Sequence, residues 1–287
     1  MSDACSNQWR GLLESLLQRG RGAGADLVEV FLERTDHIGL LAEQDRITSV
    51  NPAFARGAGL RVFRNGRDGF VSTNDLTERG LQHALDQALG MLGLEPQHLS
   101  AGSGFEGLAQ LTDHGLTKGD WLNRCPSLDH ASQCLLQGTH HLERLGQHLQ
   151  VRRGSYARDW QEVLVAASDG TFARDIRLHQ SSGLSVLAAD GDHRSSIGRR
   201  YGSTDNPEEL AHWDSEASAA EVCNSAGTML RADYVDAGQM PAVLANRFGG
   251  VILHPACGPL LETTRIARGT PPSAYRVGDL IAHPAVT

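Results

Sequence analysis

The residues most able to do chemistry surround one histidine, His254, in the C-terminal part of the sequence. Cys257 and Glu262 follow His254 within eight residues, with Pro255 and Pro259 among them. An imidazole, a thiol and a carboxylate are ordinary zinc ligands, so His254, Cys257 and Glu262 could form a nonstandard metal site. Prolines offer no ligand atom. A turn broken by two prolines would arrange these three ligands poorly, so we interpret the group as a non-functional one. Cys257 is then a small buried hydrophobe and Glu262 a solvated acid.

The two prolines also restrict the backbone that would present His254. A proline inside a helix lacks its N–H and costs roughly 3 kcal/mol relative to alanine. Pro255 is tolerated as a first helical residue, but Pro259 would then lose a first-turn hydrogen bond. We therefore expect the helix here to kink or to start later, which leaves His254 without a rigid support.

Other cysteines and histidines form no recognisable metal motif. The candidates are Cys125, Cys134, His140, His141 and His148. Their cysteines are not spaced as C-x-x-C, and no second pair balances them. We expect a helical surface with exposed histidines and one or two buried thiols, and we expect His212 and His283 to be ordinary surface histidines.

Motifs for nucleotide binding and serine hydrolysis are misplaced or absent. GRGAGA, from Gly20 to Ala25, has the spacing of a dinucleotide-binding fingerprint, but it follows a predicted helix and precedes a predicted strand. The fingerprint needs the reverse order, so this segment is interpreted as the end of a helix. The sequence contains neither a GxxxxGK phosphate loop nor a GxSxG nucleophile elbow, which removes those two classes.

Composition and charge narrow the class further. The 287 residues are 40% hydrophobic and 21% charged, as in a soluble protein of more than one domain. The net charge of −8 argues against sequence-independent binding of nucleic acid. The longest uncharged apolar stretch, Phe248 to Leu261, is too short to span a membrane, and no secretory signal is evident. With five scattered cysteines, we expect a cytoplasmic protein with reduced thiols.

Residues 1–97 are predicted to form an N-terminal α+β domain. Apolar residues at helical spacing from Trp9 to Leu17 indicate an amphipathic helix. Short alternating runs separated by turn residues follow and predict a meandering antiparallel sheet, in which Gly57 and Gly59 permit turns.

A second helix is predicted to close this domain. An apolar stripe runs from Leu81 to Leu92, while Asp75 and Glu78 have the spacing of a capping box. Asn74 and Asp75 are accordingly expected to cap the helix. The order of helix, antiparallel sheet and helix defines the α+β class.

Two further domains are predicted after a linker rich in Gly, Ser and Pro, Glu95 to Gly107. Residues 98–236 read as a β-rich middle domain with helices and with hairpin turns at Asp169-Gly170 and Asp190-Gly191. Residues 237–287 read as the beginning of a third α+β domain. Because its last residues look like a strand without partners, we expect this domain to be incomplete and the chain to be a fragment of something longer.

The order and spacing of several segments resemble a known family. The segments are GADLVEVFLER (24–34), RGAGLRVF (56–63), GFVSTNDLTE (69–78), LRADYVDAGQMPAVL (230–244) and GVILHPACGPLLE (250–262). They resemble the TldD/PmbA proteins, formerly called modulators of DNA gyrase, which act as zinc metallopeptidases on short or unfolded peptides. The resemblance extends along the chain, but only the last segment carries chemistry.

That last segment departs from the family's zinc motif. Active members have a His, then a Glu, then three residues, then a second His, with a further ligand much later. Here His254 keeps the first ligand position, Pro255 stands at the general-base position and Pro259 at the second His. Since proline can neither hold the ion nor accept a proton, the resemblance implies an impaired or inactive homologue with a degenerate motif. Zinc belongs to the family, and we expect this chain to bind none.

Two alternatives stay open. The chain could be a non-catalytic partner subunit, similar to PmbA-type members, which lack the metal motif and pair with an active subunit. Such a protein would form a homodimer or heterodimer and offer its sheet edges to an extended peptide. Alternatively, it could be a truncated or decaying gene product. A role at DNA gyrase has no residue-level support, and the sequence does not identify the peptide.

Overall fold

The computed structural model describes residues 3–95, 104–114, 124–244 and 246–262. The chain divides into two compact units, Met1–Ala232 and Asp233–Thr287. No helix in the described part of the chain has the length and apolarity needed to cross a membrane.

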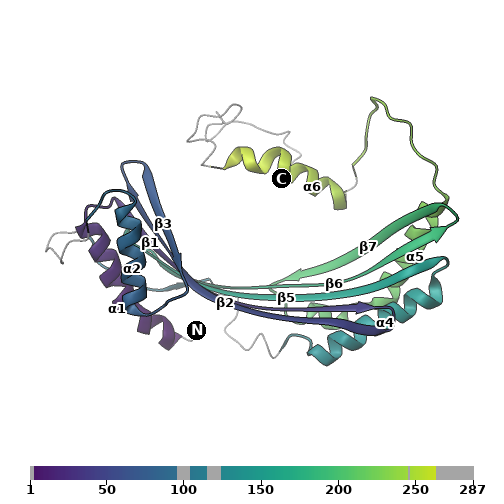
Figure 1. The fold of residues 1–287 in the computed structure, drawn as a ribbon, viewed down its shortest axis with the longest axis horizontal. Helices are drawn as coiled ribbons and strands as arrows, with labels where there is room; N and C mark the ends of the chain where they lie inside the picture. The colour runs from purple at the N-terminus through teal and green to yellow at the C-terminus, as the bar shows by residue number, and fades with distance from the viewer. Residues whose placement is uncertain (1–2, 96–103, 115–123, 245, 263–287) are drawn as a thin grey trace. The chain divides into compact units, whose positions relative to one another are not determined.

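The first unit is built on one seven-stranded sheet (Figure 1). Its strands are β1 (Leu27–Glu43), β2 (Arg46–Arg64), β3 (Arg67–Thr73), β4 (Thr112–Asp113), β5 (Leu149–Ala167), β6 (Phe172–Asp190) and β7 (His193–Thr204). They follow the order β3-β2-β1-β5-β6-β4, and β7 also pairs with β6. All pairs are antiparallel except the short β4–β6 pair. The predicted α+β class with an antiparallel sheet is confirmed.

Strand length differs from the prediction. The runs expected as separate short strands merge into continuous strands, β1 and β2. Gly57 and Gly59 lie inside β2 and pair with Glu33 and Phe31 on β1, so their interpretation as turn residues is wrong. The physical reason is that β1 pairs along nearly its whole length with both β2 and β5, so the ladder carries the polar and small residues between the apolar runs.

Four helices cover the sheet: α1 (Asp3–Gly22), α2 (Glu78–Gly90), α4 (Leu128–Leu145) and α5 (Ser215–Arg231), with a 3-10 turn η1 (Glu209–His212). Val30 and Leu32 of β1 belong to the apolar core beneath α1 and α2, whereas Leu40 lies in a core with Ala131 and Leu135 of α4. Because side chains alternate along a strand, the even-numbered residues of β1 all point to one face. Both helix pairs therefore cover the same face of the sheet (Figure 1).

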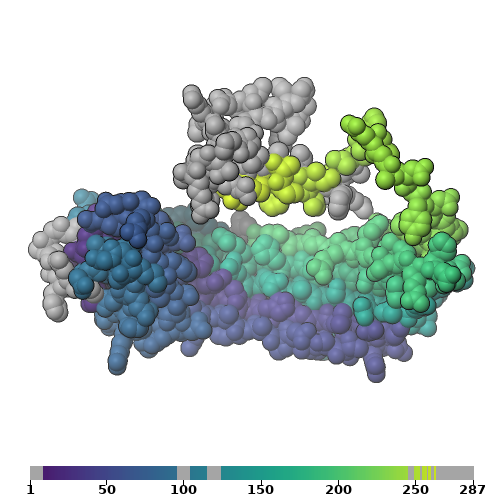
Figure 2. Space-filling model, turned by 45° about the horizontal axis from the view of Figure 1, so that its top comes forward, coloured from purple at the N-terminus to yellow at the C-terminus, as the bar shows by residue number. Residues whose placement is uncertain are grey.

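The other face bears the odd-numbered residues of β1, from Glu29 to Leu41, and their partners on neighbouring strands. We call it the open face, because no helix in the described part of the first unit packs on it. The space-filling view shows that β3 and α2 (blue) lie at one end of this unit, while β6 and β7 (green) extend to the other (Figure 2).

The cap of α2 differs from the prediction. Thr77 is the N-cap, and its hydroxyl accepts a hydrogen bond from the backbone N–H of Gly80 at 3.1 Å. Asp75 lies two residues earlier and accepts from both the backbone N–H and the hydroxyl of Thr77. The expectation that Asn74 and Asp75 cap the helix is thus wrong, since Asp75 fixes the cap residue rather than replacing it.

The second unit contains α6 (Asn246–Cys257) and a 3-10 turn η2 (Gly258–Leu261). The expectation of a later helix start is wrong, because α6 begins well before His254 and includes Pro255. Proline at this position lacks the N–H that would donate to the carbonyl oxygen of Val251, so α6 contains it at the cost of one helical hydrogen bond. The α-helix changes to 3-10 geometry just before Pro259.

Candidate functional site

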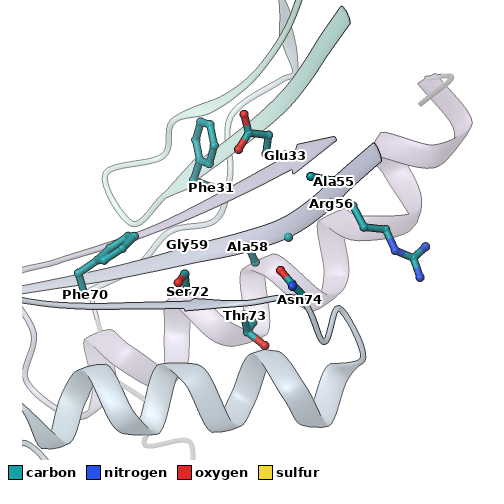
Figure 3. Close-up of a pocket in the computed structure, with 11 residues that line it drawn as sticks. Phe31, Glu33, Ala55, Arg56, Ala58, Gly59, Phe70, Ser72, Thr73 and Asn74 are labelled. Atoms are coloured by element: carbon teal, nitrogen blue, oxygen red, sulfur yellow. The ribbon is translucent and has the colours of Figure 1, made fainter. Parts of the chain in front are cut away.

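The open face contains a pocket of about 320 Å³ at the junction of β1, β2 and β3 (Figure 3). Its lining residues are Phe31, Glu33, Ala55, Arg56, Gly57, Ala58, Gly59, Phe70, Ser72, Thr73 and Asn74. A second hollow of about 260 Å³ shares Phe31, Gly59 and Phe70 with it. The two hollows form one aromatic depression, which we call the Phe31–Phe70 pocket.

Strand register places these side chains together. Phe31 of β1 pairs with Gly59 of β2, and Gly59 pairs with Ser72 of β3. A Cβ atom added to Gly59 would lie 3.0 Å from the Phe70 ring. The missing side chain therefore makes room for the ring, and the backbone of β2 becomes the floor of the pocket.

The aromatic walls are unusually exposed for their type. Phe31 is 38% exposed and Phe70 is 50% exposed. Exposed apolar groups gathered in a hollow with a few polar neighbours are typical of binding surfaces. This pocket is the strongest candidate site in the described part of the chain.

The larger hollow contains one carboxylate, Glu33, and Glu29 lines the smaller one. Phe31, Glu33, Phe70 and Ser72 point to the same side of the sheet, whereas Arg56 points away (Figure 3). Glu33 accepts a hydrogen bond from the side-chain amide of Gln161, which holds it in place. The pocket can thus take an apolar or aromatic side chain and still offer a negative charge and a hydroxyl at its rim.

The cation in the adjoining hollow is already paired. The Arg61 guanidinium lies 5.3 Å from the centre of the Phe70 ring and 3.6 Å from the carboxylate of Asp68. A guanidinium over an aromatic ring is a favourable cation–π arrangement. Arg61 therefore packs against one side of Phe70. The carboxylate of Glu33 gives the larger hollow its negative charge.

A polar row crosses the open face beyond the pocket. In register order it contains His37, Asp159, His179 and Thr204 on β1, β5, β6 and β7. The Nδ1 atom of His37 lies 2.6 Å from a carboxylate oxygen of Asp159, and the Nδ1 atom of His179 lies 3.2 Å from the Thr204 hydroxyl. A carboxylate at Nδ1 orients an imidazole and leaves Nε2 for other partners. Sequence reasoning missed this row, because only the strand register reveals it.

Of the residues predicted as metal ligands, the structure describes the side chains of His254 and Glu262. His254 is exposed in the last turn of α6, Glu262 is exposed directly after η2, and the Cys257 side chain lies outside the described atoms. Pro255 and Pro259 have no ligand atom. The residues that the structure describes include no cluster of three or more His, Cys, Asp or Glu suited to a metal. A catalytic zinc ion is held by three protein ligands, and the described side chains of this segment offer two, so the expectation that the segment binds no zinc stays a prediction.

The other cysteines and histidines are dispersed. Cys134 of α4 lies 3.5 Å from a ring nitrogen of His130, and His141 lies 3.9 Å from Glu216 of α5. Cys125 is buried beside Trp160, and this burial raises the pKa of its thiol. His148 has a positive φ of 59° just before β5, and His212 ends η1, whereas His283 lies outside the described residues.

Two family models match the chain. Residues 28–92 match the model for PmbA/TldA metallopeptidase domain 1, and residues 126–240 match the model for the PmbA/TldA metallopeptidase central domain. Together these models cover more than half of the chain. The first match ends before the predicted linker, residues 95–107, and the second begins after it.

Curated relatives agree with these matches. A metalloprotease TldD homologue from Haemophilus influenzae is 27% identical over 240 residues, which are 81% of this chain and 48% of the relative. Another from Buchnera aphidicola is 24% identical over 272 residues, which are 90% of this chain and 54% of the relative. The chain thus spans about half the length of the curated relatives it matches.

Solved structures share the fold. A putative modulator of DNA gyrase from Bacteroides thetaiotaomicron aligns with a TM-score of 0.63 at 15% identity, over 90% of this chain and 58% of that one. A second putative modulator, from Thermotoga maritima, gives 0.59 at 11% identity, over 79% and 50%. TldE from Thermococcus kodakarensis gives 0.56 at 16% identity, over 75% and 47%.

Proposed function

Since the two family models cover more than half of the chain, this protein belongs to the PmbA/TldD metallopeptidase family, and we propose that it is a cytoplasmic homologue that does not itself hydrolyse peptides. The observation that carries this proposal is the pair of prolines that follow His254, of which Pro255 lies inside α6. The segment keeps one imidazole and lacks the side chains that a zinc hydrolase needs beside it.

The missing groups have distinct tasks. In a zinc peptidase the metal polarises the scissile carbonyl and activates a water molecule, while a carboxylate accepts the proton of that water. Pro255 cannot accept a proton, and Pro259 cannot bind a metal. His254 is exposed and could at most hold an ion weakly together with other ligands.

Metal analysis of the intact chain tests the proposal. The purified protein should contain substoichiometric zinc, and the content should be the same in the His254→Ala variant, because any residual ion is adventitious. Unfolded, fluorescently labelled casein should be cleaved no faster than in buffer. Stoichiometric zinc that is lost in His254→Ala, together with turnover abolished by a chelator, would overturn the proposal.

The second candidate function is that of a non-catalytic partner subunit that binds peptide for an active relative. The Phe31–Phe70 pocket supports it, because a hollow lined by exposed aromatic rings can accept an apolar side chain without a metal. The strand β2 supports it too: β3 pairs only with Ala58–Arg64, so the outer edge of residues 46–57 has no strand partner among the described residues. An extended peptide recognises such an edge through its backbone.

Peptide binding and co-purification test the partner role separately. A fluorescent unfolded peptide should bind the chain, and Gly59→Val should weaken binding because the new side chain invades the pocket. Gly202→Val is the matched control, because Gly202 of β7 lies on the same open face of the sheet but outside the pocket. This variant should bind the peptide normally. A tagged chain should also recover a metal-binding family member from its native extract. A chain that stays monomeric, recruits no relative and binds peptide equally in both variants would exclude this role.

A further inference from the structure

A separate hollow of about 220 Å³ lies on the open face where β5, β6 and β7 run side by side. It is lined by Ser155, Gly183, Leu184, Ser185, Gly198, Arg199 and Arg200. Ser155 pairs with Gly183, which pairs with Arg200, and Ser185 pairs with Gly198 in the next row. These side chains therefore share one face, at the end of the sheet away from the Phe31–Phe70 pocket.

Two of the lining residues direct their side chains to the other face. Leu184 packs in the core beneath α4 and α5. The Arg199 guanidinium contacts Glu221 at 3.1 Å and the Ser225 hydroxyl at 3.2 Å, both on α5. Since neighbours on a strand point in opposite directions, Arg200 points to the open face. The side chains that face the hollow are those of Ser155, Ser185 and Arg200.

Two glycines shape the floor. A Cβ atom on Gly183 would lie 2.7 Å from the carbonyl oxygen of Arg199, and one on Gly198 would lie 3.2 Å from the Cβ of Ser185. Both positions therefore leave backbone where other residues would place a side chain. The result is a shallow floor between two hydroxyls and a guanidinium.

The charge of this hollow is positive and unbalanced. No carboxylate lines it, and within the described residues the Arg200 side chain makes no hydrogen bond or ion pair. Two other arginines of the open face are paired: Arg153 lies 3.6 Å from Glu43, and Arg177 lies 2.7 Å from Asp175. The hydroxyls of Ser155 and Ser185 also have no partner among the described residues.

We propose that Arg200, Ser155 and Ser185 bind an oxyanion group, either a carboxylate or a phosphate. A guanidinium presents a planar fork of donors that matches both groups and binds them through paired, charge-assisted hydrogen bonds. Two serine hydroxyls can donate to the remaining oxygens. The site is independent of the zinc motif and of the Phe31–Phe70 pocket, so it does not rest on the proposed function.

Titration calorimetry of the full chain at constant ionic strength tests the proposal. The probes are inorganic phosphate, an N-acetylated tripeptide with a free terminal carboxylate, and the same tripeptide as its amide. At least one of the two anions should bind saturably, and the amide should not. Binding of the carboxylate alone, of phosphate alone or of both identifies which source of the oxyanion the site accepts.

Substitutions distinguish a specific anion site at Arg200 from a general effect of positive charge on the open face. Arg200→Gln should weaken anion binding about tenfold or more, the size expected for the loss of a charge-assisted hydrogen bond, and Arg200→Lys should restore part of it. Arg194→Gln removes the same charge from the same strand outside the hollow and should change affinity less than about twofold. Equal weakening by Arg200→Gln and Arg194→Gln, or no saturable binding of either anion, would overturn the proposal. Arg200 is exposed, so these variants should fold, which their thermal unfolding checks.

Discussion

At the scale of single residues, Glu162 is the most deeply buried charged side chain among the described residues. It is 1% exposed on the helix-covered face, and its carboxylate lies 2.8 Å from a guanidinium nitrogen of Arg174. Arg174 also contacts Asp113 of β4 at 3.1 Å. A buried charge is tolerated only when it is paired and hydrogen-bonded.

Arg174→Met should therefore destabilise the protein by about 3–5 kcal/mol, because it leaves the Glu162 carboxylate buried without its cation. Urea unfolding followed by circular dichroism measures this loss. Arg177→Met, which removes an exposed arginine from the same strand, should cost less than about 1 kcal/mol. Equal effects of the two substitutions would contradict the structural role of the Glu162–Arg174 pair.

A second prediction concerns pH. Burial raises the pKa of Tyr156 to about 12 from an ordinary value of 10, because the phenolate is poorly solvated there. The stabilisation linked to this group is complete below pH 10 and is lost as pH rises towards 12. Absorbance at 295 nm should show a late-ionising tyrosine in the wild type that is missing in Tyr156→Phe. Tyr234→Phe, at a site 98% exposed, is the control and should leave the late transition in place.

Sequence could identify individual chemical groups but not their neighbours in space. The departures at Pro255 and Pro259 are visible in one segment, because the motif is local. Phe31 and Phe70 are far apart in sequence and meet only through the register of β1, β2 and β3. A shift of one residue in that register would place one of them on the opposite face.

At the scale of elements, β3 approaches α2 through a glycine. A Cβ atom on Gly69 would lie 2.4 Å from the carbonyl oxygen of Ala88, in the last turns of α2. Backbone cannot move aside as easily as a side-chain tip. This one residue therefore sets how closely the strand and the helix can pack.

Gly69→Ala should destabilise the protein by about 1–3 kcal/mol, as overpacking in a close contact does. Gly90→Ala is the matched control, since a Cβ at the end of α2 meets nothing within 4 Å. It should be neutral or slightly stabilising because alanine favours the helix. Chemical unfolding of both variants checks the difference, and a neutral Gly69→Ala would show that β3 can shift freely.

Helices were easier to predict than strand lengths. The stripe Leu81, Ala84, Leu85, Ala88 and Leu89 is buried in α2, as its helical spacing predicts. The middle of β2 reads as a break, because Asn51, Pro52 and Gly57 disfavour strands. Proline is confined to edge strands because it has no N–H to donate to a neighbouring strand. Pro52 lies in the part of β2 that β3 does not reach, which is an edge among the described residues.

At the scale of the whole molecule, the first unit does not separate into independent halves. The core beneath α1 and α2 contains Leu164 of β5 and Phe172 at the start of β6. β1 pairs with β5 from Glu29 to Glu43. The predicted division at residue 97 stays a prediction, although one sheet runs across it.

Truncation tests this dependence. Residues 1–232 should fold alone and unfold cooperatively near the temperature of the full chain, because the buried cores lie within this unit. Residues 1–97 should be unfolded or aggregated, because β1 then exposes a long edge and the core beneath α1 and α2 loses Leu164 and Phe172. Melting curves by circular dichroism distinguish the two. A well-folded, monomeric fragment 1–97 would contradict this view and support the division.

The pairing of β1 with β5 also has a consequence for biosynthesis. More than a hundred residues separate the partners, such as Glu43 and Arg153. At about 5–20 residues per second, β1 leaves the ribosome on the order of ten seconds before β5 exists. During that interval the nascent chain has an unpaired strand edge, so its production in cells should depend on chaperones that bind exposed strands before translation reaches β5.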